Sequence, residues 1–229
     1  MDRLDEILRR SRAAESDAGA WHALLAKCAR DMQVATLGKD FSALYRNAKQ
    51  TFIRTLHGYS TADAELKAAN DARAIAVLHA SLSELAVDSN SADTAFDSWH
   101  ARTCGRLREA WNGPCALTVG QAQKLVNVLL KSILTLPDSE HGLAAARWTR
   151  HLHVPIDNQT RALLAELDRN TTRARRPSEH APNWSATSWS RISDYDRDYL
   201  PLQLALRDWA RGERVSPISV DLVGWRPGE

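Results

Sequence analysis

Apolar side chains recur at intervals of three and four residues along most of the chain, the spacing that places them on one face of an α-helix. The first two apolar stripes are formed by Leu4, Ile7 and Leu8 and then by Trp21, Leu24, Leu25 and Cys28. Similar patterns cover residues 40–57 and 61–85, and Ser91 is a suitable cap for the helix that follows. The pattern predicts a series of amphipathic helices over residues 1–112.

Asn112-Gly113-Pro114 ends this series, because glycine permits a positive φ and proline lacks an N–H donor. A later helical pattern covers residues 190–211, and Pro201 predicts a kink or a new start within it. Alternation typical of strands is missing apart from residues 215–223. We therefore expect an all-α, multi-helix globular fold. A helical region over 1–112 and a second over 113–229, which carries the candidate site, should pack as one compact unit.

The most informative helix begins after Thr118. Thr118 and Gln121 have the spacing of a capping box, in which each side chain bonds to the other residue's backbone N–H. The apolar side of the helix consists of Ala122, Leu125, Val126, Leu129, Leu130 and Ile133. The opposite side consists of Gln123, Lys124, Asn127 and Lys131. A solvated face is the simplest interpretation of that polar stripe.

A Val-Pro-Ile-Asp segment, residues 154–157, precedes another helical pattern. Pro155 favours an extended conformation at Val154. Asp157 then occupies the N-cap position, where its carboxylate accepts backbone N–H bonds and benefits from the positive end of the helix. Such a carboxylate is held ionised and oriented, which suits an active site as well as a structural cap.

These two segments together resemble the helix-hairpin-helix DNA glycosylase superfamily. The resemblance rests on Gly120-x-x-x-Lys124 on one helix and Val154-Pro-Ile-Asp157 before a later one. The separation between lysine and aspartate and the Pro-x-Asp motif are closest to the archaeal 8-oxoguanine DNA glycosylases. Residues 217–225 are similar to the C-terminal segment of that branch. Thr118 stands where the family's hairpin has its first glycine.

The resemblance implies a fold, a reaction and two catalytic residues. Lys124 would attack the sugar of a flipped nucleotide, and Asp157 would stabilise developing positive charge and assist proton transfer. Lys131 lies about two helical turns beyond Lys124 and is the rival nucleophile. The function expected on this basis is that of a DNA glycosylase/abasic-site lyase, with no cofactor and with double-stranded DNA as the partner.

Charge adds a candidate DNA surface. The net charge of +2 does not demand a nucleic-acid partner, but a local basic cluster is formed by Arg169, Arg173, Arg175 and Arg176. We interpret Arg173, Arg175 and Arg176 as candidate phosphate contacts. Gln123, Asn127, Lys131, His153 and Trp225 complete the candidate substrate-binding and DNA-binding residues. Trp225 is one of eight tryptophans, any of which could pack in the core or stack on a base.

Cysteine and histidine spacing argues against a metal site or a disulfide framework. The three cysteines, Cys28, Cys104 and Cys115, are odd in number and lack a C-x-x-C motif. His151 and His153 alternate without a third ligand nearby. The charged first residues and the lack of a long apolar run predict a cytoplasmic protein without a membrane span.

Two other functions are compatible with the sequence. The first is a non-catalytic helical module that retains the fold and binds DNA or a protein partner. The second is an unrelated helical immunity or regulatory protein whose Trp-rich tail contacts a protein. The sequence does not decide between them, because one fold can carry many functions.

Overall fold

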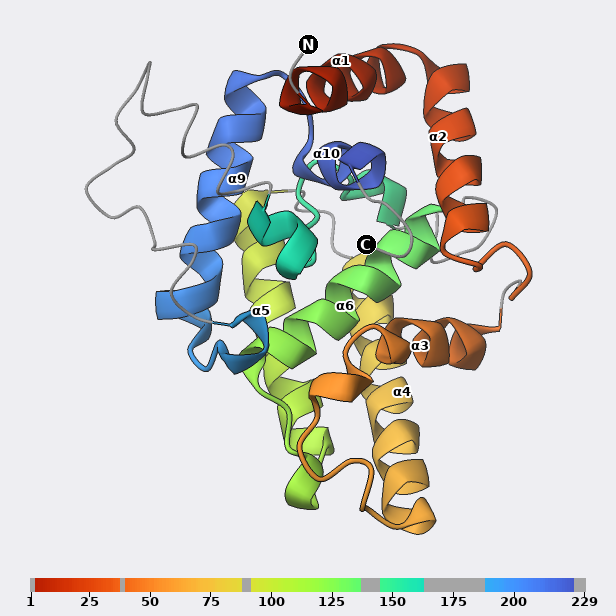
Figure 1. The fold of residues 1–229 in the computed structure, drawn as a ribbon, viewed down its shortest axis with the longest axis vertical. Helices are drawn as coiled ribbons and strands as arrows, with labels where there is room; N and C mark the ends of the chain where they lie inside the picture. Colours follow the sequence, from red (N-terminus) through yellow and green to blue (C-terminus); the bar gives the residue numbers. More distant parts are fainter. Residues whose placement is uncertain (1–2, 38–39, 88–91, 137–144, 163–187, 225–229) are drawn as a thin grey trace.

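The computed structural model describes residues 3–37, 40–87, 92–136, 145–162 and 188–224. Within these ranges every regular element is helical, so the all-α prediction is confirmed (Figure 1). The α-helices with defined bounds are α1 (Arg3–Ser16), α2 (Ala18–Asp31), α3 (Phe41–Gln50), α4 (Ala64–Val87), α5 (Asp93–Ala110), α6 (Val119–Leu134), α9 (Leu200–Gly212) and α10 (Pro217–Gly224). None of the helices in these ranges is long and apolar enough to cross a lipid bilayer.

In the described part of the chain, shorter helical turns occur at four places. Three are 3₁₀ turns, Ile53–Thr55, Gly113–Cys115 and Trp189–Arg191, and one is a π-helical turn, Tyr195–Tyr199. Gly113 has a φ of 74°, which explains why the stop after α5 requires glycine. The π-helical turn leads directly into α9, whose first turn contains Pro201, so the predicted new start is confirmed.

Three boundaries differ from those predicted. The expected helix over residues 40–57 ends at Gln50, and a 3₁₀ turn follows. Ala92, without a side-chain cap, occupies the N-cap of α5 in place of Ser91. Residues 215–223, the most strand-like stretch of the sequence, contain most of α10. Helix α10 packs against α1, α2 and α9, and these tertiary contacts outweigh the β propensity of its valines and isoleucine.

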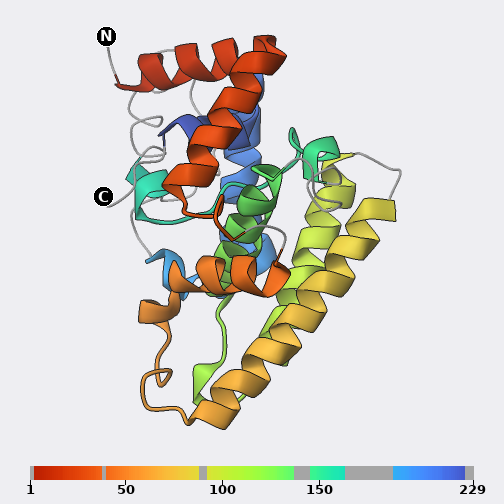
Figure 2. The same cartoon turned by 90° about the vertical axis from the view of Figure 1, so that its right-hand side faces the viewer.

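Helix α6 lies at the centre of the molecule (Figures 1 and 2). It contacts α3, α5 and the two turns that precede α9, and every residue in it except Val128 is buried. The interpretation of its polar stripe as a solvated face is therefore wrong, because neighbouring elements cover that side as well. The polar groups on this stripe must bond to other protein groups, since burying them without partners would be costly.

Contacts cross residue 113 in several places. Helix α1 packs on both α2 and α10, and α5 packs on α6. In Figure 1, α1, α2 and α10 lie together at one end of the molecule, while the first half of α4 and the second half of α5 extend to the other. Buried apolar residues from both sides of residue 113 belong to a shared core.

Candidate functional site

Lys124 and Asp157 meet, as the sequence predicts. Lys124 Nζ lies 3.2 Å from Asp157 Oδ2, and the two side chains are 10% and 22% exposed. On another side, Nζ lies 4.5 Å from the centroid of the Trp189 ring, within the range of a cation–π contact. The amine is thus placed between a carboxylate and an indole, close to the protein surface but largely covered.

The two oxygens of Asp157 have different partners. Oδ1 accepts hydrogen bonds from the backbone N–H groups of Gln159 and Thr160, both at 3.0 Å. Oδ2 faces Lys124. Asp157 is therefore an N-cap whose second oxygen is directed at the amine, which confirms its predicted structural role.

Gln123, the neighbour of Lys124, is buried and holds the segment before Asp157. Its Oε1 accepts from Ile156 N–H at 3.3 Å, and its Nε2 donates to Ile156 C=O at 3.1 Å. Gln203 on α9 makes the same pair of bonds to Val154, at 3.0 and 2.7 Å. The extended Val154–Ile156 segment is thus bound by two side-chain amides that replace the partners of a β-ladder.

Asn127 extends this polar cluster into the core. Its Nδ2 donates to Gln123 Oε1, Val154 C=O and Tyr199 Oη, and its Oδ1 lies 2.8 Å from His100 Nε2. With Nε2 as the donor, His100 Nδ1 is free to accept from Tyr195 Oη at 2.8 Å. The neutral imidazole therefore has a partner for both of its nitrogens.

His153 occupies the far end of the same network. Its Nδ1 lies 3.0 Å from Tyr199 Oη and its Nε2 lies 2.7 Å from Asp97 Oδ1, which also accepts from Arg207. Burial lowers the pKa of both His100 and His153. Burial alone would raise the pKa of Asp97, but hydrogen bonds from His153 and Arg207 outweigh it and hold that pKa below its usual range.

Lys131, the rival nucleophile, forms a second buried ion pair. Its Nζ lies 2.6 Å from Asp221 Oδ2 on α10, with side-chain exposures of 4% and 11%. Burial raises the pKa of Asp221, although the charge of Lys131 opposes that shift. Lys131 is therefore more enclosed than Lys124 and has a different carboxylate partner.

The start of α6 is covered by residues 188–192. The capping box of Thr118 and Gln121 is present, and Thr118 Oγ1 also donates to Ser190 C=O at 2.8 Å. Gly120 N–H donates to Ile192 C=O at 3.0 Å. A Cβ on Gly120 would lie 1.9 Å from Trp189 C=O, so only glycine fits. The backbone that would grip a phosphate in a helix-hairpin-helix is instead bonded within the protein.

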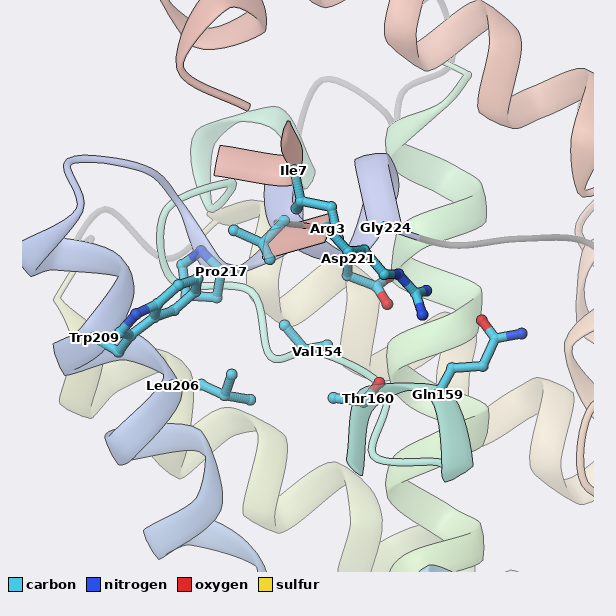
Figure 3. A pocket seen from close by; sticks show the side chains of 11 residues that line it. Arg3, Ile7, Val154, Gln159, Thr160, Leu206, Trp209, Pro217, Asp221 and Gly224 are labelled. Carbon is cyan, nitrogen blue, oxygen red and sulfur yellow. The ribbon is translucent and has the colours of Figure 1, made fainter. Parts of the chain in front are cut away.

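A small pocket lies beside the second ion pair (Figure 3). Its polar residues are Arg3 and Asp221, together with Gln159 and Thr160 from the turn that Asp157 caps. Its apolar side includes Trp209 on α9. Neither Lys124 nor Asp157 lines it, so the pocket and the Lys124–Asp157 contact are neighbouring features joined through residues 157–160.

The remaining candidate residues are placed as follows. Gln123, Asn127, Lys131 and His153 are buried within the protein, where a DNA contact would first require the covering elements to move. Arg173, Arg175, Arg176 and Trp225 lie outside the described residues. Cys28, Cys104 and Cys115 are buried and free, and the described part of the chain contains no cluster of side chains suited to a metal ion.

The sequence-based predictions omit several residues that contact or support this site, among them Trp189, Gln203 and His100. Trp189 lies next to a segment that the sequence gives no regular pattern, and nothing local indicates that it reaches Lys124. Gln203 and His100 occupy ordinary helical positions. Their roles depend on contacts with residues far away in the chain, which no local pattern encodes.

Comparisons of the chain with protein-family models, with curated proteins and with solved structures found no match.

Proposed function

We propose that this protein is a DNA glycosylase/abasic-site lyase of the helix-hairpin-helix type, with Lys124 as nucleophile and Asp157 as its assisting carboxylate. The observation that carries the proposal is the 3.2 Å contact between Lys124 Nζ and Asp157 Oδ2. Lys124, in the second turn of α6, and Asp157, an N-cap, are 33 positions apart in the sequence, and their contact supports the pairing of nucleophile and carboxylate that we propose. Their orientation relative to each other is fixed by hydrogen bonds from the α6 side chains to the segment before Asp157.

The chemistry follows from these two groups. Asp157 takes a proton from the Lys124 ammonium, which leaves a neutral amine with a free electron pair. The amine forms a bond to C1′ of the sugar while the bond from C1′ to the base breaks, and the base leaves with that electron pair and is protonated by solvent. The nitrogen then loses a second proton to solvent, and Asp157 passes the proton it accepted to O4′ as the bond between C1′ and O4′ breaks. This gives an iminium ion, which the restored Asp157 carboxylate stabilises electrostatically.

Access to Lys124 depends on Trp189. The indole ring covers the amine, so a flipped nucleotide that reaches Nζ must displace this ring or slide along it. An aromatic ring beside the nucleophile also offers a surface on which an extrahelical base can stack. The 3₁₀ turn Trp189–Arg191 is therefore the element that the proposed reaction requires to move.

The second candidate is a non-catalytic helical module that binds DNA or a protein and keeps Lys124–Asp157 as a structural ion pair. One observation favours it: Gly120 N–H is bonded to Ile192 C=O, and the start of α6 is packed against Trp189 C=O. A phosphate cannot approach this backbone without displacing residues 188–192.

Borohydride trapping separates the two candidates. The protein is incubated with duplexes that contain an abasic site, 8-oxoguanine or uracil, and the iminium ion is reduced to a stable adduct. Lys124→Gln should abolish the adduct. Lys49→Gln is the matched control, because Lys49 is also buried, is paired with Asp71 and lies beside the rings of Tyr45 and Tyr59.

We expect Lys49→Gln to trap DNA at the wild-type level once its fold is verified by circular dichroism. DNA binding without any adduct would overturn the lyase proposal and favour the non-catalytic module. Absence of DNA binding even at low salt, where phosphate contacts are strongest, would exclude the lyase and a DNA-binding module and would favour a protein-binding module.

A further inference from the structure

The side chain of Gln123 makes more contacts with the Asp157 segment than a core amide needs for burial. Both ends of its amide bond to Ile156, the residue before Asp157, and Nε2 also donates to Gly120 C=O at 2.8 Å. Gln123 itself directly precedes Lys124. The Gln123 side chain thus links the backbone of α6, which carries Lys124, to the backbone of Ile156, which precedes Asp157.

We infer that Gln123 is a positioning residue, which sets the distance between Lys124 and Asp157 through the backbone of Ile156. The expected effect of Gln123 on the reaction rate rests on the proposed function. Its effect on the distance between Lys124 and Asp157 does not. Asp157 is the next residue after Ile156, so a shift of the Ile156 backbone moves the Asp157 carboxylate relative to α6. Reacting groups are sensitive to shifts of about 1 Å, which can lower a rate by roughly 100-fold.

Asn127 supports the same arrangement from one turn further along α6. Its Nδ2 donates to Gln123 Oε1 at 2.9 Å and reaches Val154 C=O at 3.3 Å. This contact fixes which end of the Gln123 amide is the acceptor, and so directs Oε1 at Ile156 N–H and Nε2 at Ile156 C=O. The polar stripe of α6 is therefore the surface on which the Val154–Asp157 segment is aligned.

The chain contains a matched control for this inference. Gln203 makes the same two bonds to Val154 from α9, is equally buried, and lies on a different helix from Lys124. Gln123→Met and Gln203→Met each remove one amide with little change of volume. Both should lower the thermal stability, because Gln123→Met removes the side-chain partner of both Ile156 N–H and Ile156 C=O, and Gln203→Met removes that of Val154 N–H. Only Gln123→Met should disturb the ion pair.

The first measurement is the rate of borohydride trapping on abasic DNA. In Gln123→Met we expect the rate at saturating DNA to fall by about 10- to 100-fold, with the DNA concentration for half-maximal rate unchanged. In Gln203→Met the rate should fall less, because Val154 lies two residues further from Asp157 than Ile156 does and keeps its hydrogen bond from Asn127. Equal effects of the two substitutions would overturn the inference, because they would reflect general loss of structure.

The second measurement does not depend on activity. Acetic anhydride labelling of the folded protein, followed by mass spectrometry, gives the acylation rate of each of the six lysines. Gln123→Met should raise the acylation rate of Lys124 on the order of 10-fold, because it weakens the charge-assisted contact between Lys124 and Asp157. Gln203→Met should not. An unchanged Lys124 rate in Gln123→Met would overturn the inference even if the wild type traps DNA.

The two failures can be told apart. If the wild-type protein traps no DNA, the proposed function fails and the acylation rates alone decide the role of Gln123. If Gln123→Met does not fold, Gln123→Glu replaces it, since glutamate retains the acceptor for Ile156 N–H and loses the donor to Ile156 C=O. Its Lys124 acylation rate should then lie between those of the wild type and Asp157→Asn.

Discussion

The two carboxylate oxygens of Asp157 have different partners. Oδ1 caps the helix that starts after it, and Oδ2 faces the Lys124 amine. The sequence predicts both halves of this arrangement, because a Pro-x-Asp segment before a helical pattern and a lysine after a capping box are local signals. It does not predict Trp189, whose contact with Lys124 depends on how residues 188–192 fold back over α6.

Asp157→Asn separates the two roles. Asparagine is an equally good N-cap, so the start of the helix should be retained, and the melting temperature should fall only through loss of the counter-charge of Lys124. The charge next to Lys124 is lost, however, and with it the group that accepts the amine proton in the reaction that we propose. We expect the trapping rate on abasic DNA to fall by about 100-fold or more. A trapping rate equal to that of the wild type would show that the carboxylate has no part in the reaction.

The burial of α6 depends on the elements that pack against it. The capping box and the apolar stripe of this helix are readable from the sequence, and both are present. Its complete burial is not readable, because a polar stripe of Gln123, Lys124, Asn127 and Lys131 normally indicates solvent. Burial follows from the packing of α3, α5 and the turns before α9, and that arrangement depends on contacts across the whole chain.

Gly120→Ala tests the packing of residues 188–192 on α6. The new Cβ would lie 1.9 Å from Trp189 C=O, and a backbone atom cannot yield cheaply. We expect a loss of about 1–3 kcal/mol in the free energy of unfolding, measured by urea denaturation. Gly105→Ala in α5 is the control, since its Cβ would meet nothing within 4 Å. That substitution should stabilise the protein by about 0.5–1 kcal/mol. Equal effects of the two substitutions would contradict the packing described here.

The polar network through Asn127 joins parts of the chain that are distant in sequence. It connects His100 on α5, His153 before the Asp157 turn and Tyr199 before α9. Helical periodicity predicts the helix that carries His100. It does not predict the network, because a buried histidine in an amphipathic pattern resembles any other polar residue at a helix surface.

The network makes the stability of the whole molecule depend on pH. Burial holds the pKa of His100 well below 6.5, so the unfolded chain takes up a proton there and the folded chain does not. Stability is therefore complete above pH 7 and decreases as the pH falls below about 6.5, by roughly 1 kcal/mol per pH unit for this histidine. The lowered pKa of His153 acts in the same direction. The lowered pKa of Asp97 adds a further loss only below about pH 4.

Urea denaturation between pH 7.5 and 5.5 measures this dependence. His100→Gln should give a flatter profile, because the proton uptake of the unfolded state at this position disappears. His22→Gln is the control, since His22 is exposed on α2 and should leave the slope of the wild type intact. A slope unaffected by His100→Gln would show that the network does not keep this histidine neutral.

The position of the trapped sugar shows whether Lys124 is the nucleophile, as we propose. The borohydride-reduced adduct with abasic DNA is digested with nuclease and protease, and the modified peptide is sequenced by mass spectrometry. We predict that the sugar remnant is attached to Nζ of Lys124. Attachment to Lys131 or to any other amine, or absence of an adduct despite DNA binding, would contradict the account.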